Sequence, residues 1–273
     1  MGTVRADGDS VLNLPQPDRT PLTNAALPLV VAQARFDGVV SALDQATVRQ
    51  LQEALGAQGL DCPQVNAVSG MDIVVGPGQQ SQASPSIHGW QLVTADGQMQ
   101  VTVMPDSAAI ETPAFRSYDE QFGQHLAAVL AAVNDTLAPV TTKRLGIRFV
   151  NVLKTPAGVD PGDWTAWIRP SLCAPLTDPE LSPGVIGATH QLVLQLATDV
   201  RSTIRTGAVD ADGPAWLLDI DTFTEPSSLW STEDVRKGFD ALNTHCVSVF
   251  HALITQDMLN YLRRTRPKGE QAP

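Results

Sequence analysis

The sequence predicts an α+β protein in which one antiparallel sheet has long helices packed on one face. In both halves of the chain, short strand-like runs are bounded by turn residues, which is typical of strands joined by hairpins. Each half then ends in a longer segment whose apolar residues recur at helical spacing. Because each of these helices carries one apolar stripe, a shared sheet would bury both stripes at once.

Composition and charge exclude several functional classes. The 273 residues are 43% hydrophobic, which is ample for a packed core. The formal charge of -11 repels polyphosphates, so nucleic acid is a disfavoured partner. Cys62, Cys173 and Cys246 lie far apart without a Cys-x-x-Cys spacing, which indicates reduced thiols in a cytoplasmic protein. No apolar run approaches the roughly 20 residues of a spanning helix, so no membrane association is expected.

The first half begins with an arm, a strand and a helix. Residues 1–27 contain prolines among polar residues, which suit neither a helix nor a central strand and predict an extended N-terminal arm. Residues 29–36 predict the first strand, and the apolar spacing within residues 44–55 predicts a helix. Residues 76–86 are rich in Gly, Pro and Ser and predict a surface loop, with a lid over a site as the alternative.

A hairpin and a long helix complete the first half. Strands at residues 90–93 and 99–103 flank Asp96 and Gly97, a pair that favours the positive φ of a hairpin turn. A third strand is predicted around residues 108–112. The helix that follows has its apolar stripe at Phe115, Tyr118, Phe122, Leu126, Val129, Leu130, Val133 and Leu137.

The second half repeats this order of elements. It opens with a strand at residues 143–151 and continues through an irregular, proline-punctuated crossover in which one short helix is expected. A helix is predicted from Thr232 to Arg263, and Ser231 with Asp234 three residues later resembles a capping box at its start. Three strands are predicted between the crossover and this helix, at residues 191–198, 202–209 and 216–223.

The shared order predicts two pseudo-repeats. The first α+β pseudo-repeat spans residues 28–140, and the second spans residues 141–263 and shares the sheet with the first. The arm at residues 1–27 precedes them, and residues 264–273 form a polar tail.

The strand at residues 143–151 is predicted to have one basic and one apolar face. Alternation directs Arg144 and Arg148 to one face of the sheet and the apolar residues between them to the other. Gly146 lies between the two arginines, where its missing side chain leaves room for a ligand or an incoming side chain. Asn151 falls on the apolar side and is expected to cap the end of the strand.

The same alternation places two acids on the basic face. Asp219 and Asp221 are predicted to share this face with Arg144 and Arg148, and Arg201 and Arg205 on the neighbouring strand join them. One interpretation is a solvated face with cross-strand ion pairs, each contributing about 0.2–1 kcal/mol. The other is a concave polar site whose guanidinium groups bind a carboxylate, a phosphate or an acidic peptide.

Motifs for metal, nucleotide or nucleophilic chemistry are absent from the sequence. Asp219 and Asp221 have no nearby His or Glu at ligand spacing, and the five histidines show no H-x-x-x-H pattern. The nucleophile elbow, the phosphate-binding loop and the dinucleotide fingerprint are also missing. The sequence therefore predicts no metal, no cofactor and no catalytic residue.

One block of residues suggests a family. The chain resembles a sporadically distributed family of bacterial proteins of about this length and no established activity, over about residues 27–262. Members have Tyr where this chain has Phe149, and a Leu-His pair where Leu242-Asn243 stands. The resemblance implies the α+β fold, a bacterial or prophage source and an accessory or defence role, and it brings no catalytic residue. It rests mainly on Arg144-Leu145-Gly146-Ile147-Arg148-Phe149-Val150-Asn151, together with Ile110-Glu111-Thr112 and Asp219-Ile220-Asp221.

Two hypotheses about function follow from the sequence. The leading one is a non-enzymatic binding protein whose polar sheet face contacts another protein or an anionic small ligand. The alternative is a small-molecule enzyme that uses the cluster of Asp219, Asp221, Arg144 and Arg148 for acid-base chemistry. A closed pocket around these four side chains would favour the enzyme, and an open face would favour binding.

Overall fold

The fold is a single ten-stranded antiparallel sheet with five α-helices in the part of the chain that the structure describes. The structure is a computed structural model, and it describes residues 11–20, 22–24, 27–39, 43–74, 82–156 and 163–264. The strands are β1 (Leu29–Asp37), β2 (Gln64–Val74), β3 (Gln82–Val93), β4 (Gln100–Met104), β5 (Ser107–Thr112), β6 (Thr141–Leu153), β7 (Ala188–Ala197), β8 (Val200–Asp210), β9 (Pro214–Thr224) and β10 (Ser228–Leu229).

The first strands of the two halves meet at the centre of the sheet. The strand order is β2-β3-β4-β5-β1-β6-β9-β8-β7, and β10 pairs with β6 outside this path. The strands of the first half therefore lie on one side of the β1/β6 pair, and those of the second half lie on the other. This order establishes the predicted antiparallel α+β sheet, while duplication of the two halves stays a prediction.

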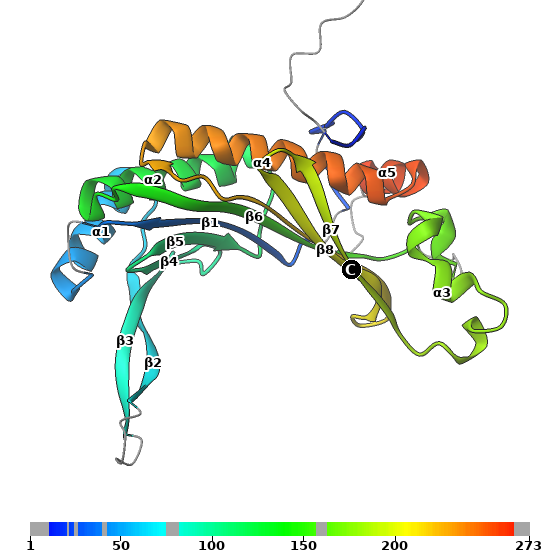
Figure 1. Ribbon diagram of the computed structural model, residues 1–273, viewed down its shortest axis with the longest axis horizontal. Coiled ribbons are helices and arrows are strands. Elements are labelled where there is room, and N and C mark those ends of the chain that lie inside the picture. Colours follow the sequence, from blue (N-terminus) through cyan, green and yellow to red (C-terminus); the bar gives the residue numbers. More distant parts are fainter. Residues whose placement is uncertain are drawn as a thin grey trace, which may run out of the picture.

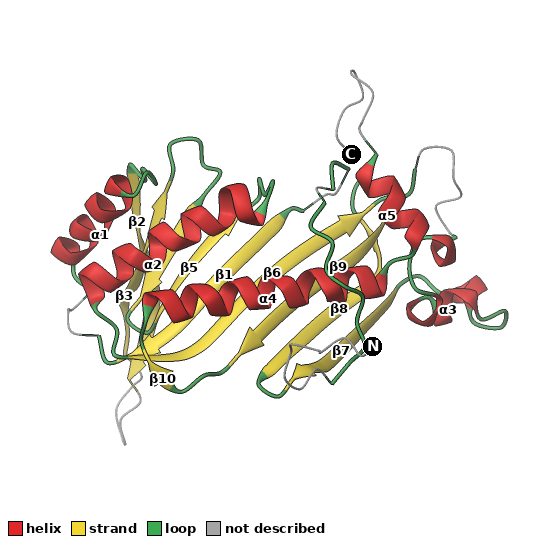
Figure 2. Cartoon of the chain, turned by 90° about the horizontal axis from the view of Figure 1, so that it is seen from above, coloured by secondary structure: helices red, strands yellow, loops and turns green. Residues whose placement is uncertain are grey.

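Helices of both halves pack against the sheet and each other. The helix α4 (Thr232–Leu253) contacts β6 and β9, and α2 (Gly123–Leu137) contacts β5 and α4. In Figure 1, α2 and α4 run along the upper side of the sheet, and Figure 2 shows them lying across the strands. The remaining helical elements are α1 (Gln45–Ala57), the π-helical turn η1 (Tyr118–Phe122), η2 (Trp164–Ala166), η3 (Pro170–Leu172), α3 (Ala174–Thr177), η4 (Ser182–Gly184) and α5 (Gln256–Arg263).

The core forms where alternating strand residues meet the helical stripes. On β6, Leu145 and Ile147 are buried on the side of α4. Gly238 of α4 allows the helix to approach, because a Cβ there would lie 2.6 Å from Cδ1 of Leu145. Ser231 caps α4 as predicted, with its side chain accepting a hydrogen bond from the backbone N–H of Asp234.

The predicted helix from Thr232 to Arg263 is wrong in one respect, because it is interrupted at Ile254. The backbone of Ile254 is extended, with φ -105° and ψ 163°, and it forms a β-bridge with Ile168 of the crossover. The N–H of Arg169 donates to the carbonyl of Leu253 at 3.0 Å, and this carbonyl would otherwise lack a partner at a helix end. The crossover thus ends α4, and Thr255 caps the new helix α5.

The expectation of a loop at residues 76–86 is also partly wrong. Residues 82–86 belong to β3, which pairs with β2 over most of its length, and residues 75–81 lie outside the described residues. The strand β2 was not predicted from the sequence. Together β2 and β3 form a long hairpin that projects downward from the sheet in Figure 1.

The described part of the N-terminal arm has neither helix nor strand and lies against the domain. The N–H of Val11 donates to the carbonyl of Leu196 on β7, and the N–H of Asn24 donates to the carbonyl of Leu262 on α5. Between these two points the arm crosses α4, as Figure 2 shows.

Close packing of β7 on β8 at Gly207 generates a stability prediction. A Cβ at this position would overlap the carbonyl oxygen of Ala188 and lie 2.9 Å from Cα of Thr189. Because both are backbone atoms, Gly207→Ala is expected to lower the free energy of unfolding in urea by about 1–3 kcal/mol.

The matched control for this variant is Gly56→Ala in α1. No atom lies within 4 Å of the added methyl group there. The helical preference of Ala is therefore expected to raise stability by up to about 1 kcal/mol. Equal effects of the two variants would contradict the packing explanation.

Candidate functional site

The candidate site lies on the face of the sheet opposite α4, which we call the open face. In the strand register, Arg148 of β6 is opposite Asp221 of β9, and Asp219 of β9 is opposite Arg205 of β8. Directly paired residues point to the same side of a sheet. Five of the six predicted site residues make ion pairs with one another here: Arg144, Arg148, Arg205, Asp219 and Asp221.

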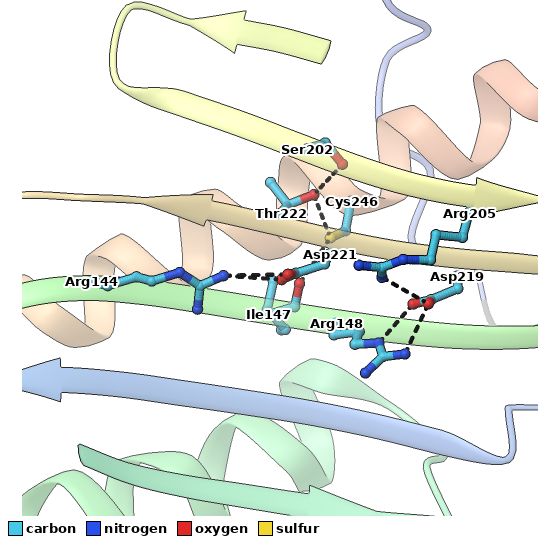
Figure 3. Close-up of polar contacts among 9 residues, drawn as sticks. All are labelled: Arg144, Ile147, Arg148, Ser202, Arg205, Asp219, Asp221, Thr222 and Cys246. Carbon is cyan, nitrogen blue, oxygen red and sulfur yellow. Dashed lines mark hydrogen bonds and ion pairs between the residues drawn. The ribbon is translucent and has the colours of Figure 1, made fainter. Parts of the chain in front are cut away.

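Asp219 is the centre of this cluster. Arg148 donates to both of its carboxylate oxygens, from Nε to Oδ1 at 2.7 Å and from Nη2 to Oδ2 at 2.8 Å. Arg205 donates from Nη1 to Oδ2 at 3.2 Å, so two guanidinium groups converge on one acid (Figure 3). The side chain of Asp219 is 5% exposed, whereas those of Arg148 and Arg205 are 42% and 49% exposed. Hydrogen bonds to Asp219 raise the pKa of Arg148, which keeps this guanidinium ionised.

Asp221 has a weaker partner. Nη2 of Arg144 lies 3.3 Å from Oδ2 of Asp221, and the same guanidinium lies over the ring of Phe223 with Cζ 4.6 Å from its centroid. A Cβ on Gly146 would come within 2.5 Å of Nη1 of Arg144, so the glycine makes room for this side chain. Burial is the largest influence on Asp221 and raises its pKa, against the opposing effects of Arg144 and Arg148.

Arg201 is the predicted site residue that the structure leaves outside these ion pairs. Its Nη1 lies 3.6 Å from Oε2 of Glu225, and both side chains are more than half exposed. Although Arg201 is opposite Phe223 in the strand register, it makes no ion pair with Asp219 or Asp221. The cluster therefore contains three arginines and two acids, with a formal charge of +1 in a chain of charge -11.

Sequence reasoning missed the polar contacts on the other side of the same strands. Sγ of Cys246 in α4 lies 3.0 Å from Oγ1 of Thr222, which in turn lies 3.0 Å from Oγ of Ser202 (Figure 3). Sγ also lies 3.8 Å from the carbonyl oxygen of Ile147. These contacts attach α4 to β6, β8 and β9 directly behind the cluster. Burial raises the pKa of the Cys246 thiol to about 12, which disfavours its nucleophilic thiolate form.

A cavity of about 160 Å³ lies on the opposite side of the sheet from the cluster. It is lined by the N-terminal arm, the start of η1, α4 and the strands β6 and β9, and neither Arg144, Arg148, Asp219 nor Asp221 lines it.

Asn151 does line the cavity, and the expectation that Asn151 caps the strand end is wrong because β6 continues to Leu153. Nδ2 of Asn151 donates instead to the carbonyl of Leu218 at 3.0 Å.

The described residues contain no group of three or more His, Cys, Asp or Glu side chains that could hold a metal ion. Asp219 and Asp221 direct carboxylate oxygens at guanidinium groups and do not converge on a shared metal-binding position. Within the same part of the chain, no helix combines the length and the apolar character needed to cross a membrane.

Comparisons with protein-family profiles and with curated proteins found no match to the chain. The resemblance drawn from the Arg144–Asn151 block therefore rests on that block and the shorter motifs alone.

The Arg148–Asp219 pair generates a prediction for stability. Arg148→Ala leaves a buried carboxylate with the single contact to Arg205, and it is expected to lower the free energy of unfolding by about 1–3 kcal/mol. In an Asp219→Asn background the same substitution is expected to cost less, because no buried charge is left without a partner. Urea unfolding of the double-mutant cycle measures this coupling, and equal losses in the two backgrounds would show that the pair is not coupled.

Asp221 generates a prediction for pH dependence. Its raised pKa means that the folded protein holds this proton more tightly than the unfolded chain. The cost of ionising Asp221 is absent below its unfolded pKa of 3.8 and complete above its higher folded pKa.

Asp221→Asn is therefore expected to gain stability relative to the wild type as the pH rises from about 4 to about 7. The measurement is the difference in free energy of unfolding between the two proteins across this range. A difference that falls as the pH rises would show that the shift has the opposite sign.

Proposed function

We propose that this protein is a non-enzymatic binding protein that holds an acidic segment of another protein on the open face. The observation that supports this most directly is the pair of half-exposed guanidinium groups, Arg148 and Arg205, converging on the buried Asp219. The buried acid orients both arginines before a partner arrives, which lowers the entropy lost on binding. Part of each guanidinium remains accessible to solvent and can donate to an incoming carboxylate.

Charge and shape support the same proposal. The cluster has a surplus of positive charge, which attracts an acidic partner locally, although the chain as a whole is acidic. In Figure 1 the β2–β3 hairpin descends at one end of the sheet and the segment that contains α3 lies at the other. An extended acidic segment would lie between these two projections.

The alternative hypothesis of a small-molecule enzyme has one observation in its favour, the raised pKa of Asp221. Acid-base chemistry at the cluster would also require a substrate-sized pocket around it, and the cavity described above lies behind the sheet. Asp219 already accepts three hydrogen bonds from two arginines, and these hold both guanidinium groups in place. Binding is the function that these contacts support better.

The cellular setting is part of the proposal. The three cysteines are unpaired and buried, which suits a reducing compartment such as the cytoplasm. The sequence resemblance adds the hypothesis of a bacterial or prophage protein with an accessory or defence role. An anionic small ligand would meet the same arginines, so the experiment below separates it from an acidic peptide.

The experiment is a titration of the full chain into a fluorescein-labelled oligo-glutamate peptide, followed by fluorescence anisotropy. Binding is expected to weaken with salt, and Arg205→Ala is expected to weaken it by about tenfold, the effect of losing one charge-assisted hydrogen bond. Arg205 is the suitable position because Asp219 retains its bidentate bond to Arg148 in this variant. Free glutamate serves as the competitor that represents a small anionic ligand.

The matched control is Arg49→Ala, which removes the same charge from the exposed surface of α1. It is expected to leave binding unchanged apart from a small effect of net charge. Equal losses in Arg205→Ala and Arg49→Ala, or no binding at low salt, would contradict the proposal. Displacement of the peptide by free glutamate at similar concentration would assign the face to a small ligand instead.

A further inference from the structure

The cavity behind the sheet has the composition of a small-molecule site. Its lining combines aromatic and aliphatic side chains with polar and charged ones, among them two carboxamides. We call it the arm cavity, because the N-terminal arm closes it. The apolar walls come from Leu22, Leu27, Phe115, Phe149, Ile220 and Phe250, and the carboxamides belong to Asn151 and Asn243.

Asn243 is the side chain that a ligand could bind. It is 2% exposed, it lines the arm cavity, and its side chain makes no hydrogen bond to any residue that the structure describes. Most side-chain amides at such low exposure have a hydrogen-bond partner in the protein, so the amide of Asn243 is available to a molecule in the cavity. Asn151, 4% exposed, uses its Nδ2 for the carbonyl of Leu218 and leaves Oδ1 as an acceptor. The cavity therefore offers both donors and an acceptor at its floor.

The aromatic walls favour a planar ring. The rings of Phe115 and Phe149 meet edge to face at 5.4 Å between centroids, and Phe115 also contacts Phe122 at 5.9 Å. An edge-to-face pair holds both rings in fixed orientations. A flat aromatic guest would fit against them better than a flexible chain.

Most of the charged side chains around the cavity are already paired, and Arg116, which also lines it, is exposed to solvent, which favours a neutral guest. At its mouth, Nη1 of Arg19 lies 2.9 Å from Asp119 and Nη2 lies 2.8 Å from Oγ1 of Thr244. Asp18 is paired with Arg263. Burial lowers the pKa of His251, so this imidazole is neutral at physiological pH. A charged ligand would find only the solvent-exposed Arg116 as a counter-charge without an ion pair among the described lining residues.

The volume sets the size of the guest. A cavity of about 150 Å³ is large enough to hold a benzene molecule. The arm cavity, at about 160 Å³, therefore holds one aromatic ring with a small polar substituent.

We propose that the arm cavity binds a small neutral aromatic molecule that carries a carboxamide-like edge, with Asn243 as its main hydrogen-bonding partner and Asn151 as a second. The amide edge of such a ligand pairs a donor and an acceptor with the complementary groups of Asn243. This site is separate from the open face, and it would remain if the acidic-partner proposal were wrong.

The arm acts as the cover of this site. Leu22 and Leu27 line the cavity, and two other described residues attach the arm to the domain. Arg19 attaches it to Asp119 and Thr244, while Nδ2 of Asn24 donates to the carbonyls of Tyr261 and Arg264. A ligand enters when these contacts open.

The experiment uses benzamide as the probe and toluene as an apolar molecule of similar size. Binding to the full chain is followed by ligand-observed saturation-transfer NMR and by calorimetry. Benzamide is expected to bind more tightly than toluene. Asn243→Leu is expected to weaken the affinity for benzamide by about tenfold or more, the effect of losing one well-placed hydrogen bond. The affinity for toluene is expected to be at least as high as in the wild type.

Two further variants make this test decisive. Asn134→Leu makes the same substitution on the exposed surface of α2 and is expected to leave the affinity for both ligands unchanged. Asn243→Ala repeats the loss of the amide without adding a larger side chain, should Asn243→Leu fail to fold. The proposal is wrong if benzamide does not bind the wild type at millimolar concentration, if toluene binds equally well, or if the folded Asn243 variants keep full affinity for benzamide.

Discussion

The alternation of side chains along β6 is the constraint on which the rest of the structure depends. This strand pairs with both β1 and β9, so it joins the two halves of the sheet and sets the register on both sides. Leu145 and Ile147 face α4, while Arg144 and Arg148 face the open side. A slip of one residue would place the arginines under the helix and the apolar residues in water. The register of β6 with β1 and β9 therefore determines both which residues pack against α4 and which side chains form the cluster on the open face.

Burial of Asp219 is an energetic cost that the arginines offset. Removing a carboxylate from water costs several kcal/mol unless it is paired and hydrogen-bonded, and here two guanidinium groups supply three hydrogen bonds. Such a pair contributes little net stability compared with a well-packed apolar pair. Its effect is to fix the position of Arg148 and Arg205, which supports a role in recognition more than in folding.

The arm cavity and the open face use opposite sides of the same two strands. Asp219 and Asp221 point to the open face, and Ile220 between them lines the cavity. Phe149 and Asn151 of β6 line it as well. Occupancy of the cavity and binding at the open face are expected to be separable by mutation, because Asn243 and Arg205 do not share a partner.

The sequence by itself determined the elements whose signals are local. Period-two alternation placed Arg144, Arg148, Asp219 and Asp221 on one face, the Asp96-Gly97 pair located a hairpin, and Ser231 marked the start of α4. Only the tertiary structure decided the end of α4, the partner of Arg201 and the position of the cavity, because each depends on contacts between segments far apart in the sequence. The crossover residues Ile168 and Arg169 contact the end of α4, where the helix stops. Arg201 forms its ion pair with Glu225 and not with the acids of the cluster. The N-terminal arm lines one cavity together with Asn151 and Asn243. The alternation of residues within one segment indicates the face to which a side chain points. Its interaction partner depends on the register and packing of segments far apart in the sequence.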